Sequence, residues 1–194
     1  MRGKRAGFTL LEMTVALALF LVVSVNVTVL MRMSSESQAE NMTVAVLDDQ
    51  AQRVMDQIAF AIMGASRDKL FPADEAPSDS SRLRYEVNLG VEDGVVVWSD
   101  PQLIELSGDT QLAWRERPGE EDERRVVWCN VVRPFLEDEI VNGFDDNGNG
   151  LIDERGLSFV LEGDTVTIRL TLERQGSDGP PVTRTLSSVV TCRN

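Results

Sequence analysis

The 194-residue chain is acidic: 32 aspartates and glutamates outnumber 19 lysines and arginines, for a formal net charge of −13. This balance argues against a nucleic-acid-binding protein, because such proteins need a basic surface to meet phosphates. The sequence has no histidine. It also lacks a nucleophile elbow, a P-loop and zinc-ligand spacing, so we predict that the protein is not an enzyme.

A hydrophobic run, residues 8–31, follows a short basic patch made of Arg2, Lys4 and Arg5. At about 1.5 Å per residue, a helix of this length crosses the hydrocarbon core of a bilayer. Positive charge ahead of the run keeps that end in the cytoplasm and sends the remainder outward. We therefore predict a single-pass membrane protein with a long N-terminal helix.

Glu12 interrupts this apolar run. A carboxylate at that depth costs about 2.5–3.5 kcal/mol on insertion scales. A plain signal anchor has no use for it, and the run is not followed by the small-residue cleavage site of a secretory signal peptide. Glu12 therefore indicates a contact that offsets the cost, such as a partner cation.

The stretch around Glu12 resembles the N-terminus of type IV prepilins and type II secretion pseudopilins. The resemblance is carried by "KRAG" followed by "FTLLE", residues 4–12. It implies that residues 1–7 are a leader and that a prepilin peptidase and methyltransferase cuts between Gly7 and Phe8 and methylates the new amino group. It also implies that Glu12 pairs with the Phe8 amine of a neighbouring subunit.

The same resemblance implies a location and partners. The chain is expected in the bacterial inner membrane, with a single span and its head in the periplasm or outside, and then in a filament. The expected partners are the peptidase, other pilin or pseudopilin subunits, an inner-membrane assembly platform and membrane lipid.

A helical pattern continues over residues 32–68. Apolar residues recur at steps of three or four, which is typical of a helix that packs one face on a core. They are Val44, Leu47, Ala51, Val54, Met55, Ile58 and Ile62. Residues 69–81, rich in proline, aspartate and serine, predict a linker.

Over residues 82–194 the period changes to two, which predicts strands of a β-rich head. Gly163-Asp164 predicts a tight turn within one strand pair. The candidate strands are residues 82–89, 94–98, 110–117, 125–132, 157–174 and 181–192. Short strands with short loops favour an antiparallel sheet, with the long N-terminal helix packed on it as a second layer. The predicted fold class is α+β.

The head also resembles, more loosely, minor pseudopilins and minor pilins of the J or W type. This resemblance is carried by "LAWRER", "VVWCNVV", "LSFVLEGDTVTIRLTLER" and "VVTCRN". It implies a subunit that is present in few copies, often at the tip of a filament.

An acidic loop, residues 142–156, resembles the D-x-[DN]-x-[DN]-G pattern of EF-hand-like and thrombospondin-type calcium sites. Hard oxygens at alternate positions around a tight turn suit Ca²⁺. Gly156 stands where an EF-hand has a bidentate glutamate, so we expect Glu154, two residues earlier, to close the ligand shell directly or through water. No pair of helices is expected on either side of the loop, so we expect a structural calcium rather than a calcium switch, with Ile152 pointing inward. The alternative is a solvent loop without an ion. The expected ligands are Asp145, Asn147, Asn149, the carbonyl of Leu151, Asp153 and Glu154.

Cys129 and Cys192 are the two cysteines, and their spacing fits neither a zinc site nor a CxxC motif. In an exported protein such cysteines are expected to pair, so we predict a disulfide between them. The alternative is two unrelated buried thiols.

Two functions follow from these patterns. The first is a structural subunit, of the minor kind, of a type IV pilus or type II secretion pseudopilus, with a head stabilised by calcium. The alternative is a membrane-tethered, calcium-dependent binding or adhesion module. Replacing Glu12 separates them, because assembly depends on that carboxylate and tethered binding does not.

Overall fold

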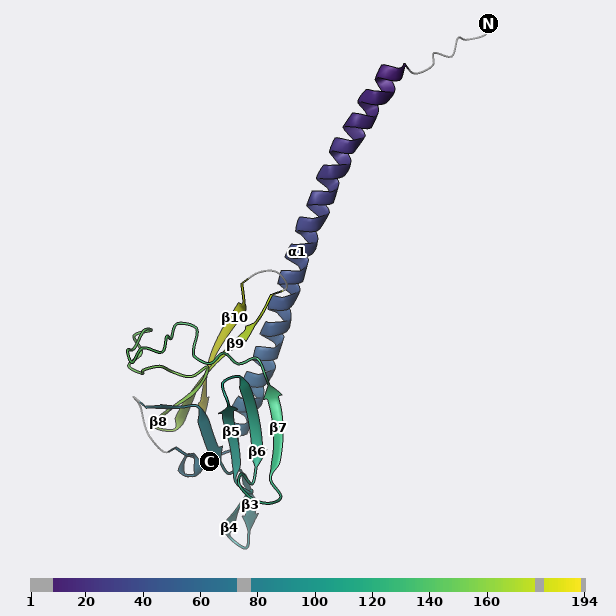
Figure 1. Cartoon of the computed structure of the whole chain (residues 1–194). Coiled ribbons are helices and arrows are strands. Elements are labelled where there is room, and N and C mark those ends of the chain that lie inside the picture. Colours follow the sequence, from purple (N-terminus) through teal and green to yellow (C-terminus); the bar gives the residue numbers. More distant parts are fainter. Residues whose placement is uncertain (1–8, 73–77, 177–179, 193–194) are drawn as a thin grey trace. The chain divides into compact units, whose positions relative to one another are not determined.

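The computed structural model describes residues 9–72, 78–176 and 180–192. The chain divides into two compact units, one ending at Met42 and the other beginning at Thr43. A long helix, α1 (Leu10–Met63), contributes its first part to one unit and its last part to the other. Antiparallel strands follow the helix, so the predicted α+β class is confirmed (Figure 1).

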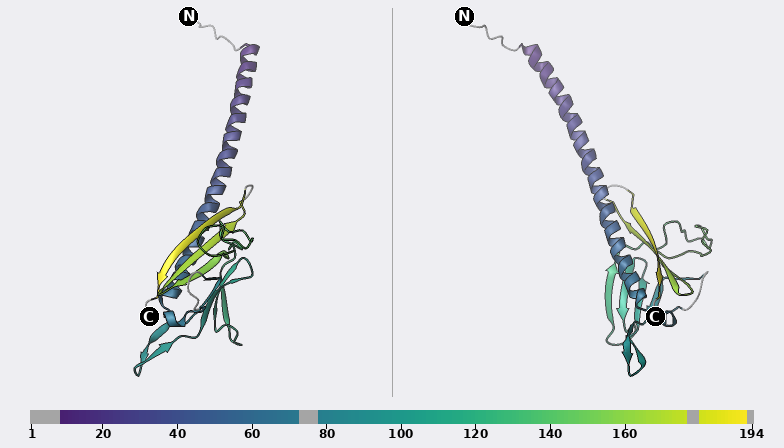
Figure 2. Two further views of the ribbon diagram at one scale, coloured as in Figure 1. Left: turned by 90° about the vertical axis from the view of Figure 1, so that its left-hand side faces the viewer. Right: turned by 180° about the vertical axis from the view of Figure 1, so that it is seen from behind.

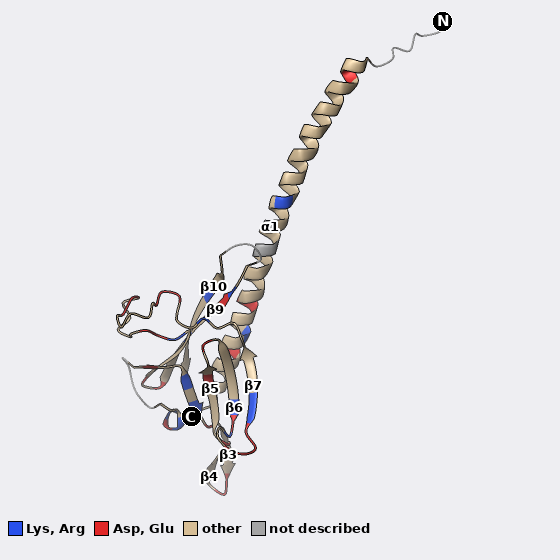
Figure 3. Ribbon diagram, in the orientation of Figure 1, with Lys and Arg blue, Asp and Glu red and all other residues tan. Residues whose placement is uncertain are grey.

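The first part of α1 is apolar over Leu10–Ser35, with a mean hydropathy of 2.4 and no buried side chain. Its 26 residues would measure about 39 Å at about 1.5 Å per residue, which is long enough to cross a membrane. Figure 3 shows how few charged residues this part of the helix carries. Such a fully exposed apolar surface needs lipid or other helices to cover it.

The last part of α1 buries one face in the head. Six of the seven apolar residues that the helical period predicted are buried there; Val44 is half-buried. The helix ends at Met63, before the predicted limit at residue 68, because Gly64 follows and glycine disfavours the helix. The next turn is a short 3-10 helix, η1 (Arg67–Lys69).

Within the described residues, the strands form two four-stranded antiparallel sheets and one hairpin, rather than a single sheet. The first sheet has the order β1 (Asp79–Ser80), β8 (Leu157–Glu162), β9 (Thr165–Arg174), β10 (Val182–Thr191). The second has the order β2 (Arg82–Tyr85), β5 (Gln102–Ser107), β6 (Gln111–Glu116), β7 (Arg124–Cys129). The hairpin pairs β3 (Asn88–Glu92) with β4 (Val95–Trp98).

Two features of these sheets bear on the predictions. The segment predicted as a linker contains β1, which pairs with Val160 and Phe159 of β8. The predicted turn between β8 and β9 is present, and its Gly163 has a positive φ of 55°. The chain thus enters the sheet before residue 82, where the sequence placed the start of the head.

One core joins the last part of α1 to both sheets. Buried residues of the helix, of β2, β5 and β6, and of β8 and β9 form a single cluster. Figure 2 shows the strands of the head beside this part of the helix from two further sides. An ion pair also connects the helix to the first sheet: Arg184 of β10 pairs with Asp48 of α1 at 2.6 Å.

Arg115 of β6 organises the charged connection between β6 and β7. Its guanidinium donates to Glu123 at 2.7 and 2.6 Å and to Glu105 at 2.9 Å. These bonds to Arg115, helped by the backbone N–H of Gly119, lower the pKa of Glu123 from 4.5 to about 2.

We expect this depressed pKa to shape the acid side of the stability curve. The contribution of Glu123 is present above pH 4.5, the ordinary pKa, and is lost as the pH falls to about 2. Glu123→Gln should therefore lower stability at pH 7 and flatten its fall between pH 5 and 2. Urea unfolding at a series of pH values measures this, with the exposed Glu162→Gln as control. Parallel curves for wild type and Glu123→Gln would refute it.

Candidate functional site

The first turn of α1 is closed by a reciprocal pair of side chains, Thr9 and Glu12. The Thr9 backbone N–H and hydroxyl donate to Oε2 of Glu12 at 2.8 and 3.0 Å. The Glu12 backbone N–H donates to the Thr9 hydroxyl at 3.3 Å. This is a capping box, which satisfies orphan N–H groups at the start of a helix. The T-x-x-E spacing ahead of an apolar run could have revealed it in the sequence.

The cap uses one oxygen of the Glu12 carboxylate, Oε2, and leaves the other, Oε1, without a hydrogen bond from the described residues. The side chain is exposed, so Oε1 can accept a bond from another molecule while the cap stays intact. The predicted cleavage residues, Gly7 and Phe8, lie outside the described residues.

Two aspartates organise the backbone of the acidic loop, residues 142–156. Asp145 accepts the backbone N–H groups of Gly148 and Gly150, both at 2.7 Å, and that of Asn149 at 3.2 Å. These bonds, the one from Gly150 foremost, lower the pKa of Asp145. Asp153 accepts the backbone N–H of Asn142 at 3.0 Å and that of Gly143.

Glu154 binds the side chains of two other predicted ligands, Asn147 and Asn149. It is fully buried and pairs with Arg169 of β9 at 2.6 Å. Its other oxygen accepts the side-chain amides of Asn147 and Asn149, and the Ser158 hydroxyl lies 3.4 Å from Oε1. The structure therefore brings Asn147, Asn149 and Glu154 together at the base of the loop.

Leu151, predicted to bind through its carbonyl, anchors the loop with its side chain. That side chain is buried, whereas the neighbouring Ile152 is exposed. The expectation that Ile152 points inward is therefore wrong. The alternation changes here because positive-φ residues, Gly150 and Asp153, flank the pair.

Glu139 was missed in the sequence and is the unusual residue of this region. Its side chain is only 2% exposed, and neither carboxylate oxygen has a hydrogen-bond partner among the described residues. Burial raises its pKa, and the charges of Glu154, Asp146 and Asp145 raise it further, whereas the backbone N–H of Asp153 acts in the opposite direction. Glu139 precedes the loop motif, so the spacing that revealed the motif gave no signal for it.

The described residues contain no group of three histidine, cysteine, aspartate or glutamate side chains placed to hold a metal. A cation at the loop would therefore need asparagine oxygens and backbone carbonyls as well as carboxylates. The calcium site stays a prediction at this point.

In the structure Cys129 and Cys192 are both free, buried thiols, and the disulfide between them stays a prediction. Cys129 ends β7 in one sheet, where its sulfur accepts a bond from Gln50 of α1 at 3.5 Å. Cys192 follows β10 in the other sheet, where its N–H donates to the carbonyl of Asp164. The two thiols thus belong to different sheets, which the spacing of cysteines along the chain does not encode.

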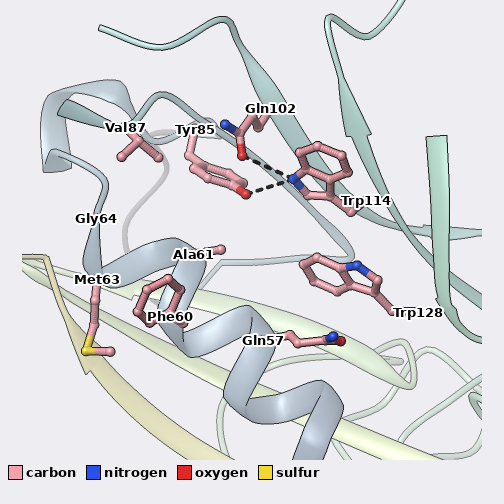
Figure 4. A pocket seen from close by; sticks show the side chains of 10 residues that line it. All are labelled: Gln57, Phe60, Ala61, Met63, Gly64, Tyr85, Val87, Gln102, Trp114 and Trp128. Carbon is pink, nitrogen blue, oxygen red and sulfur yellow. Dashed lines mark hydrogen bonds between the residues drawn. The ribbon is translucent and has the colours of Figure 1, made fainter. Parts of the chain in front are cut away.

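An apolar pocket of about 610 Å³ lies between the last turns of α1 and the second sheet (Figure 4). Trp114 lines it and donates its indole N–H to the Tyr85 hydroxyl at 3.0 Å and to Gln102 at 3.1 Å. Burial raises the pKa of Tyr85 to about 12. Phe60 is 77% exposed at the pocket. The lining carries no charged side chain, so the pocket suits an apolar group.

Residues 2–25 match the protein family described as the prokaryotic N-terminal methylation motif. The match spans the basic patch, the Gly7-Phe8 junction and Glu12. Comparison with the curated proteins and comparison with the solved structures each returned no match. The chain therefore carries the motif that is the hallmark of type IV pilins and pseudopilins, as the sequence indicated.

Proposed function

We propose that this chain is a structural subunit, of the minor kind, of a bacterial type IV pilus or type II secretion pseudopilus. The observation that carries the proposal is the N-terminal methylation motif at residues 2–25, placed directly at the start of an apolar helix. The peptidase cuts after Gly7 and methylates Phe8. The helix then anchors the subunit in the inner membrane until it enters the filament.

Assembly uses the carboxylate at the start of the helix. The Thr9 cap holds Glu12 Oε2 and leaves Oε1 for the Phe8 ammonium of a neighbouring subunit. A carboxylate in an apolar environment is strongly disfavoured unless it meets a cation. One such pair per subunit fixes the axial register of neighbouring helices, and the exposed apolar side chains of α1 are then covered by the other helices.

Processing is tested on the protein isolated from membranes by intact mass spectrometry. We expect a chain that begins at Phe8 and carries one N-terminal methyl group, and retention of residues 1–7 in cells that lack the peptidase. Unprocessed protein in peptidase-containing cells would refute the proposal.

The kind of filament is tested by crosslinking intact cells and identifying what co-purifies with the detergent-solubilised protein. Recovery of other pseudopilins with a secretion platform would make it a pseudopilus component. Recovery of a major pilin with a retraction motor would make it a minor pilin.

A second candidate function, a membrane-tethered binding or adhesion module, is favoured by the apolar pocket of about 610 Å³ on the head. In that case Glu12 serves only the helix cap. Filament subunits would then be absent from the crosslinked material.

A further inference from the structure

The Glu139 carboxylate is buried without a compensating positive charge. It is 2% exposed, and both of its oxygens lack a hydrogen-bond partner among the described residues. A buried carboxylate ordinarily has a paired charge or several hydrogen-bond donors, because leaving water is costly for it. Here roughly four lone-pair positions are unused.

The surroundings of Glu139 add negative charge and not positive charge. Asp145, Asp146 and Glu154 all act on it as like charges. The described arginines of this region are engaged elsewhere: Arg169 with Glu154, Arg155 with Asp109, and Arg133 with the carbonyls of Leu136 and Glu137. The cluster therefore has an excess of carboxylates and no cation bound to Glu139.

The end of the acidic loop has no room for the glutamate that closes an EF-hand site. A Cβ added at Gly156 would lie 1.8 Å from the carbonyl oxygen of Arg133. No side chain fits at this twelfth position of the loop. A closing carboxylate must therefore come from another position, and Glu139 is buried within reach of the charges of Asp145, Asp146 and Glu154 with its oxygens unused.

We propose that the head binds one calcium ion beside the acidic loop and that the Glu139 carboxylate, from outside the loop motif, is a direct ligand. Asp145 keeps lone-pair capacity beyond its backbone bonds and is the second carboxylate ligand. Asp153, which the motif predicted as a ligand, instead holds the backbone N–H groups of Asn142 and Gly143. The side-chain oxygens of Asn147 and Asn149 each accept one backbone N–H and keep a second lone pair. The carbonyl of Leu151 completes the set.

In this assignment Glu154 is a positioning residue and not a ligand. Arg169 compensates its charge, and it accepts the N–H groups of both asparagine amides, so that their oxygens are free to face a cation. Glu139 thus takes the place that the motif alone gave to Glu154.

Calcium suits this site better than magnesium. Ca²⁺ accepts six to eight oxygen ligands in irregular geometry, whereas Mg²⁺ demands a small, near-ideal octahedron. An irregular loop that mixes carboxylates, amide oxygens and a backbone carbonyl matches the coordination preferences of Ca²⁺. The site lies wholly in the head, so it does not depend on how the N-terminal helix is used.

The test measures thermal unfolding of the full-length, detergent-solubilised protein, first freed of metal with a chelator and then given CaCl₂ or MgCl₂. With a Kd of about 0.1–1 mM, usual for extracellular modules, 10 mM CaCl₂ should raise the Tm by about 4–10 °C. MgCl₂ should give a clearly smaller rise. An unchanged Tm in CaCl₂ overturns the site, and an equal rise in MgCl₂ overturns the choice of calcium.

The decisive variant is Glu139→Gln, with Glu162→Gln as the matched control at the exposed far end of β8. Because glutamine removes an uncompensated buried charge, the calcium-free Tm of Glu139→Gln should equal or exceed that of the wild type. Its calcium-dependent rise should fall below about 2 °C, while Glu162→Gln keeps the full rise. A full rise in Glu139→Gln, or a calcium-free Tm several degrees below the wild type, overturns the role of Glu139.

Discussion

Replacing Glu12 by glutamine should stop the subunit from entering filaments without removing it from the membrane. Glutamine still accepts the Thr9 N–H, and it serves in capping boxes as glutamate does, so the helix start is kept. What is lost is the charge that meets the Phe8 ammonium of a neighbour. Removing one partner of a buried ion pair costs about 3–5 kcal/mol. That corresponds to a loss of subunit affinity of roughly 100-fold or more.

The matched control is Thr9→Ala, which removes the cap hydroxyl and keeps the charge. Losing a cap costs only about 0.5–2 kcal/mol, so this variant should still assemble. The measurement is the ratio of subunit in sheared filaments to subunit in membranes, with mass spectrometry to verify cleavage after Gly7. If Glu12→Gln assembles normally and Thr9→Ala does not, the carboxylate serves the helix cap alone.

The parts of the fold that could be predicted are those whose pattern is local. The helical period marked the face of α1 that is buried. An apolar run, a Gly-Asp turn and an alternating segment marked β8 and β9. β5 was missed because Leu103 and Ile104 are adjacent and break the alternation, although only Ile104 is fully buried. β1 was missed because two residues in a polar segment become a strand only by pairing with β8.

The same distinction applies to the sites. The loop motif and Glu12 were visible because their chemistry depends on spacing along a few residues. Glu139 was not, because only tertiary burial makes it unusual. The disulfide between Cys129 and Cys192 stays a prediction for a related reason: two cysteines in a sequence say nothing of the sheets that hold them, and in the structure both are free thiols.

Substituting alanine for Gly156 should prevent the head from folding. The new Cβ would lie 1.8 Å from the Arg133 carbonyl oxygen and 2.8 Å from its carbon. Both are backbone atoms, so no side chain can rotate away. The segment is also fixed on either side, because Gly156 N–H donates to Pro134 at 3.1 Å and Arg133 N–H donates to Thr171 of β9 at 2.9 Å. Relieving the overlap breaks these bonds.

We expect Gly156→Ala to cost more than about 4 kcal/mol, which is exceptional for one residue and comparable to the whole stability of many domains. The control is Gly94→Ala in the turn between β3 and β4. There φ is +80° and no atom lies within 4 Å of the added Cβ. Only backbone strain of about 1–2 kcal/mol applies. Urea unfolding followed by tryptophan fluorescence compares the two.

The two glycines are needed for different reasons. Gly94 adopts a left-handed backbone conformation, whereas Gly156 leaves room for the backbone of Arg133. If both variants lose about the same stability, the contact at Gly156 is relieved by a small backbone shift and space is not limiting. That result would also mean that the twelfth position of the loop can hold a side chain. The steric argument for a closing carboxylate from Glu139 would then be lost. A large difference between the variants would support both conclusions, because one steric fact underlies them.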